Sequence, residues 1–217
     1  MARMFDYWKD RAKSKEFARP YSPDDKNIVV MREQLTKHVK PDGIVIDLGC
    51  GTGRAIVLLK QFFPHMKFIG LDFNPSQVEL KLCPEVALWD ITESGLPKAD
   101  FLYTMTCLMH VPPDEIEDFF GIMAHSVPKM LLLETDIGGN SYCFPHDYPG
   151  LFAKFDCKYK VVDTTNGGIS KFFLVTTPLG RPKAGRPPKP KPEGPEMVQP
   201  PKKHGRKATR SKYRLGR

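Results

Sequence analysis

Short apolar runs alternate with segments of helical periodicity through most of the chain. Apolar runs predict strands at 43–47, 67–72, 86–90, 100–105 and 129–135. Two further strands, at 159–165 and 170–177, flank Asn166-Gly167-Gly168, which is typical of a hairpin turn. Helices are predicted over 28–39, 54–63, 75–82 and 113–124, and residues 5–18 are a further helix candidate.

This order of elements predicts the fold class. Strands that alternate with helices imply a parallel sheet covered by helices on both faces. The closing hairpin adds antiparallel strands at one edge. We therefore expect an α/β protein with a doubly wound, mostly parallel, seven-stranded sheet over residues 28–177, preceded by a short segment, 1–27, and followed by a tail, 178–217.

Charge separates the tail from the rest of the chain. Of the 33 Lys and Arg residues, thirteen lie in 178–217, against two acids, although the whole chain carries a net charge of only +8. The tail also holds nine of the 21 prolines and few apolar residues. Such a segment cannot bury enough surface to offset its ordering entropy, so we expect a disordered tail with a polyanionic partner.

The five cysteines form no Cys-x-x-Cys pair, and their number is odd. A disulfide framework and a zinc site are therefore not expected, and a reducing, intracellular compartment fits best. The N-terminus has no apolar signal core, and no apolar run is long enough to cross a bilayer. The expected location is the cytoplasm or the nucleoid or nucleus, with no membrane partner and no metal.

A glycine-rich loop, Asp47-Leu48-Gly49-Cys50-Gly51-Thr52-Gly53, follows the first strand and opens a helix. Its spacing fits neither a dinucleotide fingerprint nor a phosphate-binding P-loop, because Arg54 stands at the third glycine position and a Gly-Lys-Ser/Thr ending is absent. The loop resembles that of class I S-adenosylmethionine (SAM) methyltransferases. The resemblance implies a SAM site with cofactor-binding residues Asp47, Gly49, Cys50, Gly51, Gly53 and Thr106. A glycine-rich turn without a ligand is the alternative.

Two later acids fit the same resemblance. Asp72 ends the second strand, where a carboxylate can accept the ribose hydroxyls, and Phe73 follows it. Asp90 ends the third strand; in the methyltransferase family an acid here takes the adenine amino group, and its apolar neighbour, here Ile91, packs on the ring. The N-terminal stretch resembles the family's lid helix, which implies cofactor contacts from Tyr7, Trp8 and Arg11.

The acceptor side is less specific. The segment 104–113 lacks the base-binding and Pro-Cys motifs of DNA methyltransferases and resembles the Leu-x-x-His-Val-Pro stretch of the ubiquinone-biosynthesis-like and small-molecule subgroup. Candidate catalytic residues are His110 as a general base, Glu134 at the end of the fifth strand, and His146 in a polar insert. The alternatives are a structural histidine, a solvated acid and a surface cap.

The tail contains two Gly-Arg-Pro units that resemble the AT-hook, a motif that enters the minor groove of A·T-rich DNA. Both units lack the first arginine of that motif. The predicted nucleic-acid contacts are Arg181, Lys183, Arg186, Lys189, Lys202, Lys203, Arg206, Lys207 and Arg210.

Three hypotheses follow. The first is a SAM-dependent methyltransferase associated with nucleic acid through its tail. The second is a methyltransferase of a small molecule or protein, whose tail only localises it. The third is a non-enzymatic DNA-binding protein on a methyltransferase fold, which the complete set of glycines and acids disfavours.

Overall fold

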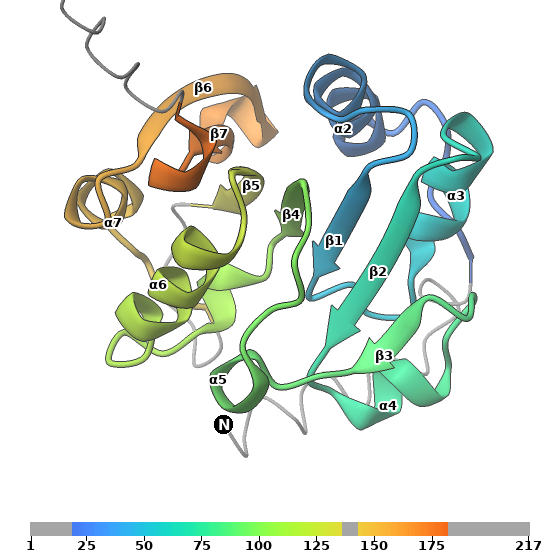
Figure 1. Ribbon diagram of the computed structural model, residues 1–217, viewed down its shortest axis with the longest axis horizontal. Helices are drawn as coiled ribbons and strands as arrows, with labels where there is room; N and C mark the ends of the chain where they lie inside the picture. The colour runs from blue at the N-terminus through green and yellow to red at the C-terminus, as the bar shows by residue number, and fades with distance from the viewer. Residues whose placement is uncertain (1–18, 136–142, 182–217) are drawn as a thin grey trace, which may run out of the picture. The chain divides into compact units, whose positions relative to one another are not determined.

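A seven-stranded sheet in the order β3-β2-β1-β4-β5-β7-β6 organises the computed structural model, which describes residues 19–135 and 143–181 (Figure 1). All neighbours pair in parallel except β7, which is antiparallel to β5 and β6. The strands are β1 (Ile44–Leu48), β2 (Lys67–Asp72), β3 (Val86–Leu88), β4 (Phe101–Met105), β5 (Lys129–Thr135), β6 (Lys158–Thr165) and β7 (Ser170–Thr176). The predicted fold class is confirmed.

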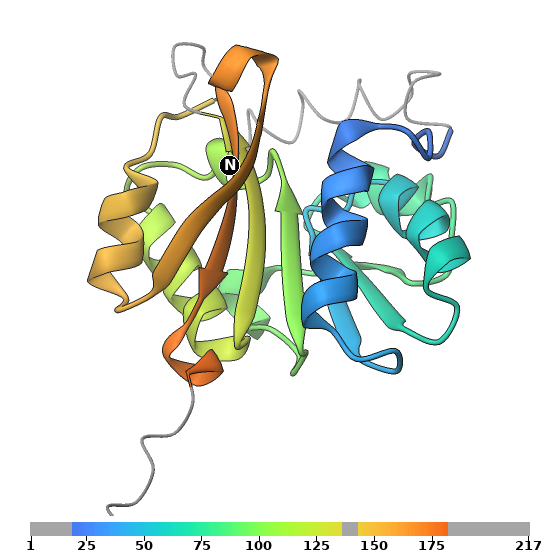
Figure 2. The same cartoon turned by 90° about the horizontal axis from the view of Figure 1, so that it is seen from above.

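Helices cover both faces of the sheet (Figures 1 and 2). They are α2 (Lys26–His38), α3 (Arg54–Phe62), α4 (Pro75–Glu79), α5 (Ile91–Ser94), α6 (Ile116–Ser126) and α7 (Tyr148–Lys154), with 3-10 turns η1 (Leu108–His110), η2 (Asn166–Gly168) and η3 (Pro178–Gly180). None of the helices in the described ranges is long and apolar enough to span a membrane.

Successive residues of the central strand serve two separate cores. Val45 packs with α2 and α3 on one face, and Ile46 packs with α6 and α7 on the other. Both side chains are fully buried, as expected for a strand inside a parallel sheet. The apolar runs of the sequence therefore reflect burial on both faces.

Three helices differ from the prediction. The short helix α5, which Asp90 caps, was not predicted. The helix predicted at 75–82 ends at Glu79, because the chain turns so that Leu82 N–H donates to the carbonyl of Thr52 in the glycine loop. Helix α7 was not predicted, since its Pro149-Gly150 pair is typical of a turn. Asp147 caps it by accepting a hydrogen bond from Gly150 N–H.

The described fold extends past residue 177, where the tail was predicted to begin. Thr177 is buried, and its hydroxyl donates to the carbonyl of Val127 at 2.7 Å. Arg181 forms an ion pair with Asp156 at 2.7 Å. The rest of the predicted tail, 182–217, and the helix candidate at 5–18 lie outside the described residues.

Candidate cofactor site

The glycine loop adopts a backbone that side chains rarely tolerate. Gly49, Gly51 and Gly53 have φ values of 74°, 57° and 84°. A Cβ on Gly49 would lie 2.6 Å from Sγ of Cys107 in the loop after β4. Gly53 caps α3, and a Cβ there would meet Val86 at 2.6 Å, so this third glycine serves packing and does not line a pocket.

Asp72 holds the loop from the neighbouring strand. Its carboxylate accepts the N–H of Gly51 at 2.7 Å and that of Asn74 at 2.8 Å. The side chain is buried, and this burial raises its pKa to about 6, although the two backbone hydrogen bonds favour the charged form. One carboxylate therefore ties two successive βα loops together.

Asp47 is the second buried carboxylate at this edge of the sheet. Burial raises its pKa to about 7, the Tyr103 hydroxyl lowers it, and the negative charge of Asp72 raises it further. A cation brought between these two acids would be stabilised by both.

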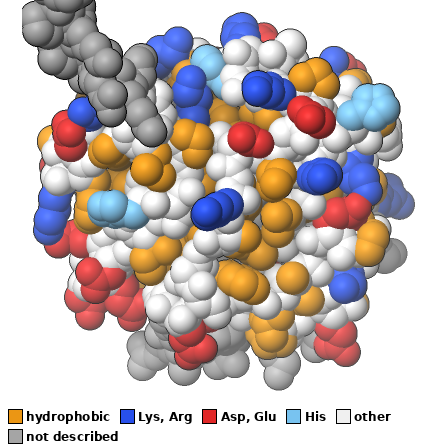
Figure 3. Space-filling model, viewed as in Figure 1, with side chains coloured by type: hydrophobic (Ala, Val, Ile, Leu, Met, Phe, Trp, Pro, Cys, Tyr) orange, Lys and Arg blue, Asp and Glu red, His pale blue; other side chains and the backbone are white. Residues whose placement is uncertain are grey.

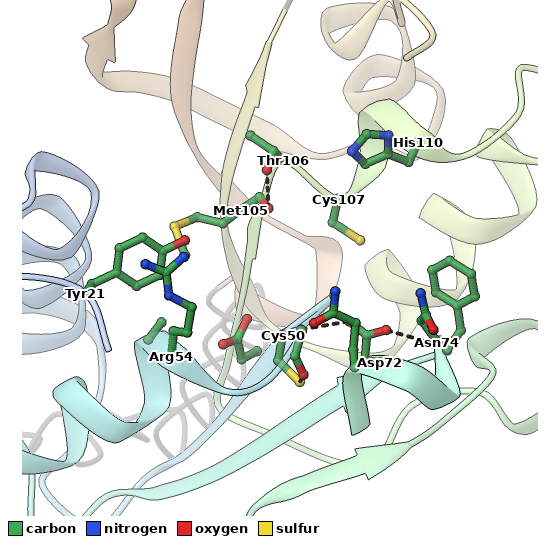
Figure 4. A pocket seen from close by; sticks show the side chains of 15 residues that line it. Tyr21, Cys50, Arg54, Asp72, Asn74, Met105, Thr106, Cys107 and His110 are labelled. Carbon is green, nitrogen blue, oxygen red and sulfur yellow. Dashed lines mark hydrogen bonds between the residues drawn. The ribbon is translucent and has the colours of Figure 1, made fainter. Parts of the chain in front are cut away.

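A first pocket lies above the glycine loop (Figure 4). It is lined by seven of the predicted cofactor residues: Asp47, Gly49, Cys50, Gly51, Asp72, Phe73 and Thr106. It is also lined by residues that were not predicted, among them Tyr21, Arg54, Asn74, Gln77 and Met105. Within the described residues, Nδ2 of Asn74 and Oε1 of Gln77 are buried without a hydrogen-bond partner. Such atoms are what a polar ligand would satisfy.

A cation–π pair between Arg54 and Tyr21 lines this pocket. The guanidinium of Arg54 lies 4.3 Å from the ring centroid of Tyr21, and its Nε donates to the carbonyl of Arg19 at 2.6 Å. No cofactor contact was predicted for Arg54, which stands in place of a third glycine. A basic residue directly after the glycines was the available signal.

A second, mostly apolar pocket adjoins the first and shares Gly49, Phe73, Cys107 and His110 with it. The predicted Asp90 and Ile91 line it, together with Trp89, Val111 and Phe119, which were not predicted. Oδ1 of Asp90 accepts hydrogen bonds from the N–H and hydroxyl of Thr92, at 2.8 and 2.6 Å.

The three catalytic candidates do not come together. His110 lines both pockets, with Nδ1 3.9 Å from Sγ of Cys143. Glu134 is buried behind the loop after β4 and lines neither pocket. His146 also lies outside both, where its Nε2 contacts the carbonyl of Leu108 at 3.0 Å. The roles predicted for Glu134 and His146 thus require the loop to move, which this geometry does not favour.

Most of the residues predicted for the lid helix and for nucleic-acid contacts lie outside the described part of the chain. Tyr7, Trp8 and Arg11 lie outside the described residues, as do eight of the nine predicted nucleic-acid contacts. The ninth, Arg181, contacts Asp156 through both the carboxylate and the carbonyl. In residues 19–135 and 143–181, no group of three or more His, Cys, Asp or Glu could hold a metal ion.

Comparisons with known proteins agree with this geometry. A family model described as a methyltransferase domain matches residues 39–82, from the end of α2 through the glycine loop to Leu82. The magnesium protoporphyrin IX methyltransferase of Synechocystis PCC 6803, solved with bound SAM, has a TM-score of 0.59 at 14% identity, over 80% of this chain and 96% of its own. The chain has the fold of the class I SAM-dependent methyltransferases.

Further matches are partial in sequence or similar in fold alone. The aminopentose methyltransferase CalS10 of Micromonospora echinaspora has a TM-score of 0.57 at 16% identity, over 75% of this chain and 94% of its own. A protein-lysine N-methyltransferase of Saccharolobus islandicus is 36% identical over 59 residues, 27% of this chain and 36% of the relative. An uncharacterized protein of Mycoplasma pneumoniae is 37% identical over 70 residues, only 15% of its length.

The two pockets at this edge of the sheet fit SAM. The first offers buried carboxylates to a positively charged amino acid moiety and to ribose hydroxyls, and the unpartnered Asn74 and Gln77 atoms add polar contacts. The second offers apolar and aromatic side chains beside Asp90, as an adenine ring requires. The glycines between the pockets leave room for the ligand to cross.

Proposed function

We propose that the protein is a SAM-dependent methyltransferase associated with nucleic acid through its basic tail. The observation that carries the enzymatic part is the paired pocket, in which buried Asp47 and Asp72 adjoin an apolar chamber that contains Asp90. Two buried carboxylates cost stability, and a bound cofactor would offset that cost.

The residues of the site divide the work of binding and orientation. SAM, when bound, supplies a methyl group already activated on a sulfonium centre, so the chain must chiefly position the acceptor. Asp72 and Asp90 would hold the ribose and the adenine. Thr106 and His110 line the first pocket and would be in reach of an acceptor bound beside SAM. A base is needed only if the acceptor arrives protonated, and His110 is the candidate in reach.

The nucleic-acid association is supported by the charge of the tail and by its two Gly-Arg-Pro units. In contrast, the methyltransferase domain presents mixed charges: on the face shown in Figure 3, Lys and Arg are interspersed with Asp and Glu. Phosphate binding in this proposal therefore depends on the tail.

A second candidate function is methyl transfer to a protein or small molecule. A polar groove, which meets the first pocket at Thr106, runs between the start of α2 and the β6–β7 turn. It is lined by hydroxyl and amide side chains, among them Asn27, Thr135, Thr164 and Thr165. The lysine in the groove, Lys26, is paired with Asp163 at 3.0 Å, so this surface favours a neutral or amine-bearing acceptor over a phosphate backbone. The archaeal relative named as a protein-lysine methyltransferase agrees with this alternative.

Two full-length variants that each lose four positive charges separate these functions. One changes Lys202, Lys203, Arg206 and Lys207 of the tail to Gln. The control changes the exposed body residues Lys37, Lys40, Lys158 and Lys160 to Gln. Transfer from radiolabelled SAM is measured into nucleic acid, protein and small molecules, and DNA affinity is measured against salt.

The proposal expects label in nucleic acid. It also expects the tail variant to lower the slope of log K against log salt by about 3–4, with little change in the control. Equal DNA affinity in all three proteins would overturn the nucleic-acid association. Label in protein or small molecules alone, equal in all three, would establish the second function. Failure of the wild-type protein to bind SAM would overturn both.

A further inference from the structure

Several hydrogen-bond donors converge on a single buried carboxylate at the end of β5, that of Glu134, which is 1% exposed. Oε1 accepts hydrogen bonds from the Thr104 hydroxyl at 2.8 Å, from Cys107 N–H at 3.2 Å and from Leu108 N–H at 3.1 Å. Oε2 accepts hydrogen bonds from Met109 N–H at 3.2 Å and from the Tyr148 hydroxyl at 3.4 Å. Within the described residues, Glu134 forms no ion pair. Burial raises the pKa of Glu134 to about 7, and these N–H and hydroxyl donors favour its charged form.

Three of these donors are consecutive backbone amides of one loop, residues 106–110, which we call the β4 loop. This loop is the shared wall of the two pockets, since Cys107 and His110 line both. Its first residue, Thr106, has φ 51°, a costly backbone conformation for a β-branched residue. Such a conformation persists only where the surroundings hold it.

The β4 loop also sets the space above the glycine loop. The side chain of Cys107 occupies the space that a Cβ on Gly49 would need, with Sγ 2.6 Å and Cβ 2.9 Å from that position. Figure 4 shows this thiol directed from the β4 loop toward Cys50 and Asp72. A shift of the β4 loop would therefore change both pockets together.

We propose that Glu134 is a positioning residue of this site: its carboxylate fixes the β4 loop against the glycine loop and so shapes both pockets. The proposal rests on the proposed methyltransferase function. Of the other two donors, Thr104 lies in β4, which the sheet holds on both sides, and Tyr148 lies in the packed core. Loss of the carboxylate would leave three adjacent amides unpaired, so the β4 loop would loosen before the sheet does.

The test uses two substitutions in the full chain. Glu134→Gln keeps an acceptor oxygen for Thr104, Cys107 and Leu108 but turns an amide NH₂ toward the N–H of Met109. Glu134→Leu removes every acceptor. Glu33→Gln, on the exposed side of α2, is the matched charge control. Leu174→Ala in β7 lowers stability through the core and is the control for general destabilisation.

Two readouts are taken well below the unfolding temperature of each variant. One is the alkylation rate of Cys107 without SAM, followed by peptide mass spectrometry over a range of pH. The pH profile separates a change in access from the lower thiol pKa that follows when the Glu134 charge is removed, and the readout needs no knowledge of the acceptor. The other is SAM affinity by calorimetry. We expect Cys107 alkylation to rise about fivefold in Glu134→Gln and tenfold or more in Glu134→Leu, because lost hydrogen bonds each contribute about 1 kcal/mol. SAM affinity should fall in the same order, and Glu33→Gln should match the wild type.

Equal alkylation in Glu134→Leu and the wild type would overturn the proposal. So would the same increase in Leu174→Ala at matched stability, because it would show a general loss of packing. If the wild-type protein binds no SAM, the proposed function fails, while the alkylation series still decides whether Glu134 holds the β4 loop.

Discussion

Two regions meet at the candidate site, and they are assembled from different kinds of contact. The glycine-loop region comprises residues 47–90, in which the three acids lie within two residues of the ends of β1, β2 and β3 and the glycines follow β1 directly. The Glu134 cluster joins residue 134 to 104–110 and 143–148, which converge only because β4 and β5 are neighbours in the sheet. The first region can be recognised as a motif, whereas the second exists only as an arrangement in space.

This difference has a physical origin. A bound cofactor requires the backbone to come close to it, and glycine permits this because it has no side chain. The glycines that serve this purpose are neighbours in the sequence, so they form a recognisable motif. A loop held by a carboxylate and a histidine ring can obtain those partners from any element within reach. Substitutions in the two regions should therefore differ in the size and nature of their effects.

The largest effect should come from Gly49→Ala. This residue has φ 74°, and its new Cβ would lie 2.6 Å from Sγ of Cys107. We expect the free energy of unfolding to fall by about 2–4 kcal/mol, with loss of SAM binding. Urea denaturation and calorimetry measure the two quantities.

Gly167→Ala is the matched control, because that residue has φ 68° and nothing lies within 4 Å of its would-be Cβ. Its free energy of unfolding should fall by only about 1–2 kcal/mol, the cost of placing an alanine backbone at positive φ. Equal losses of unfolding free energy in the two variants would mean that the contact between the glycine loop and the β4 loop does not contribute to stability.

Asp72→Asn should weaken SAM binding next most strongly. Its amide cannot accept the hydrogen bonds of both Gly51 and Asn74, so the N–H of one residue faces an NH₂ group. We expect a loss of affinity of about 30-fold or more, as one buried, charged hydrogen bond is worth about 2–3 kcal/mol. Asp90→Asn, at the half-buried adenine end, should cost less; the reverse order would break the assignment of the two pockets.

The same variant gives a prediction about pH. Burial raises the pKa of Asp72 to about 6, above its ordinary value, so the folded protein without ligand binds this proton more tightly than the unfolded chain does. Its contribution to the free energy of unfolding should therefore fall as the pH rises from about 4 to about 7. SAM affinity should rise over the upper part of that range, because the ionised acid attracts a cationic ligand. Both trends should become shallower in Asp72→Asn, although part of the stability trend should remain because burial also raises the pKa values of Asp47 and Glu134. An unchanged pH profile would contradict the assignment.

His146→Ala tests the Glu134 cluster. Burial lowers the pKa of His146, so the ring is mostly neutral at pH 7, and its Nε2–H donates to the carbonyl of Leu108. Loss of this bond should lower stability by about 1 kcal/mol and methyl transfer by less than tenfold. A fall in transfer of about 10² or more at unchanged stability would instead support the catalytic role predicted from the sequence.

Arg181→Ala should have the smallest effect. Its ion pair joins a side chain 30% exposed to an aspartate 77% exposed, so the loss should be about 0.5 kcal/mol, seen as a small shift in the unfolding temperature. DNA affinity should not change if Arg181 belongs to the folded domain. If Arg181→Ala lowers DNA affinity as much as substitution of a single tail residue such as Arg186 does, Arg181 is a nucleic-acid contact, as the sequence predicted.

The sequence by itself determined the order of the strands along the chain, the class of the sheet and most of the cofactor pocket. These features depend on local rules: apolar runs mark buried strands, and three glycines followed by acids at the next two strand ends mark a ligand edge. Asp47, Asp72 and Asp90 could therefore be placed without a structure.

Only the tertiary structure decided what each side chain does. It placed Arg54 on Tyr21, moved Glu134 and His146 from the pocket to the back of the β4 loop, and joined Arg181 to the folded domain. These contacts link residues 25 to 38 positions apart in sequence, such as the 26 between Leu108 and Glu134. No periodicity or spacing encodes such pairs, because their energies depend on burial and direction, and both exist only after the strands have paired.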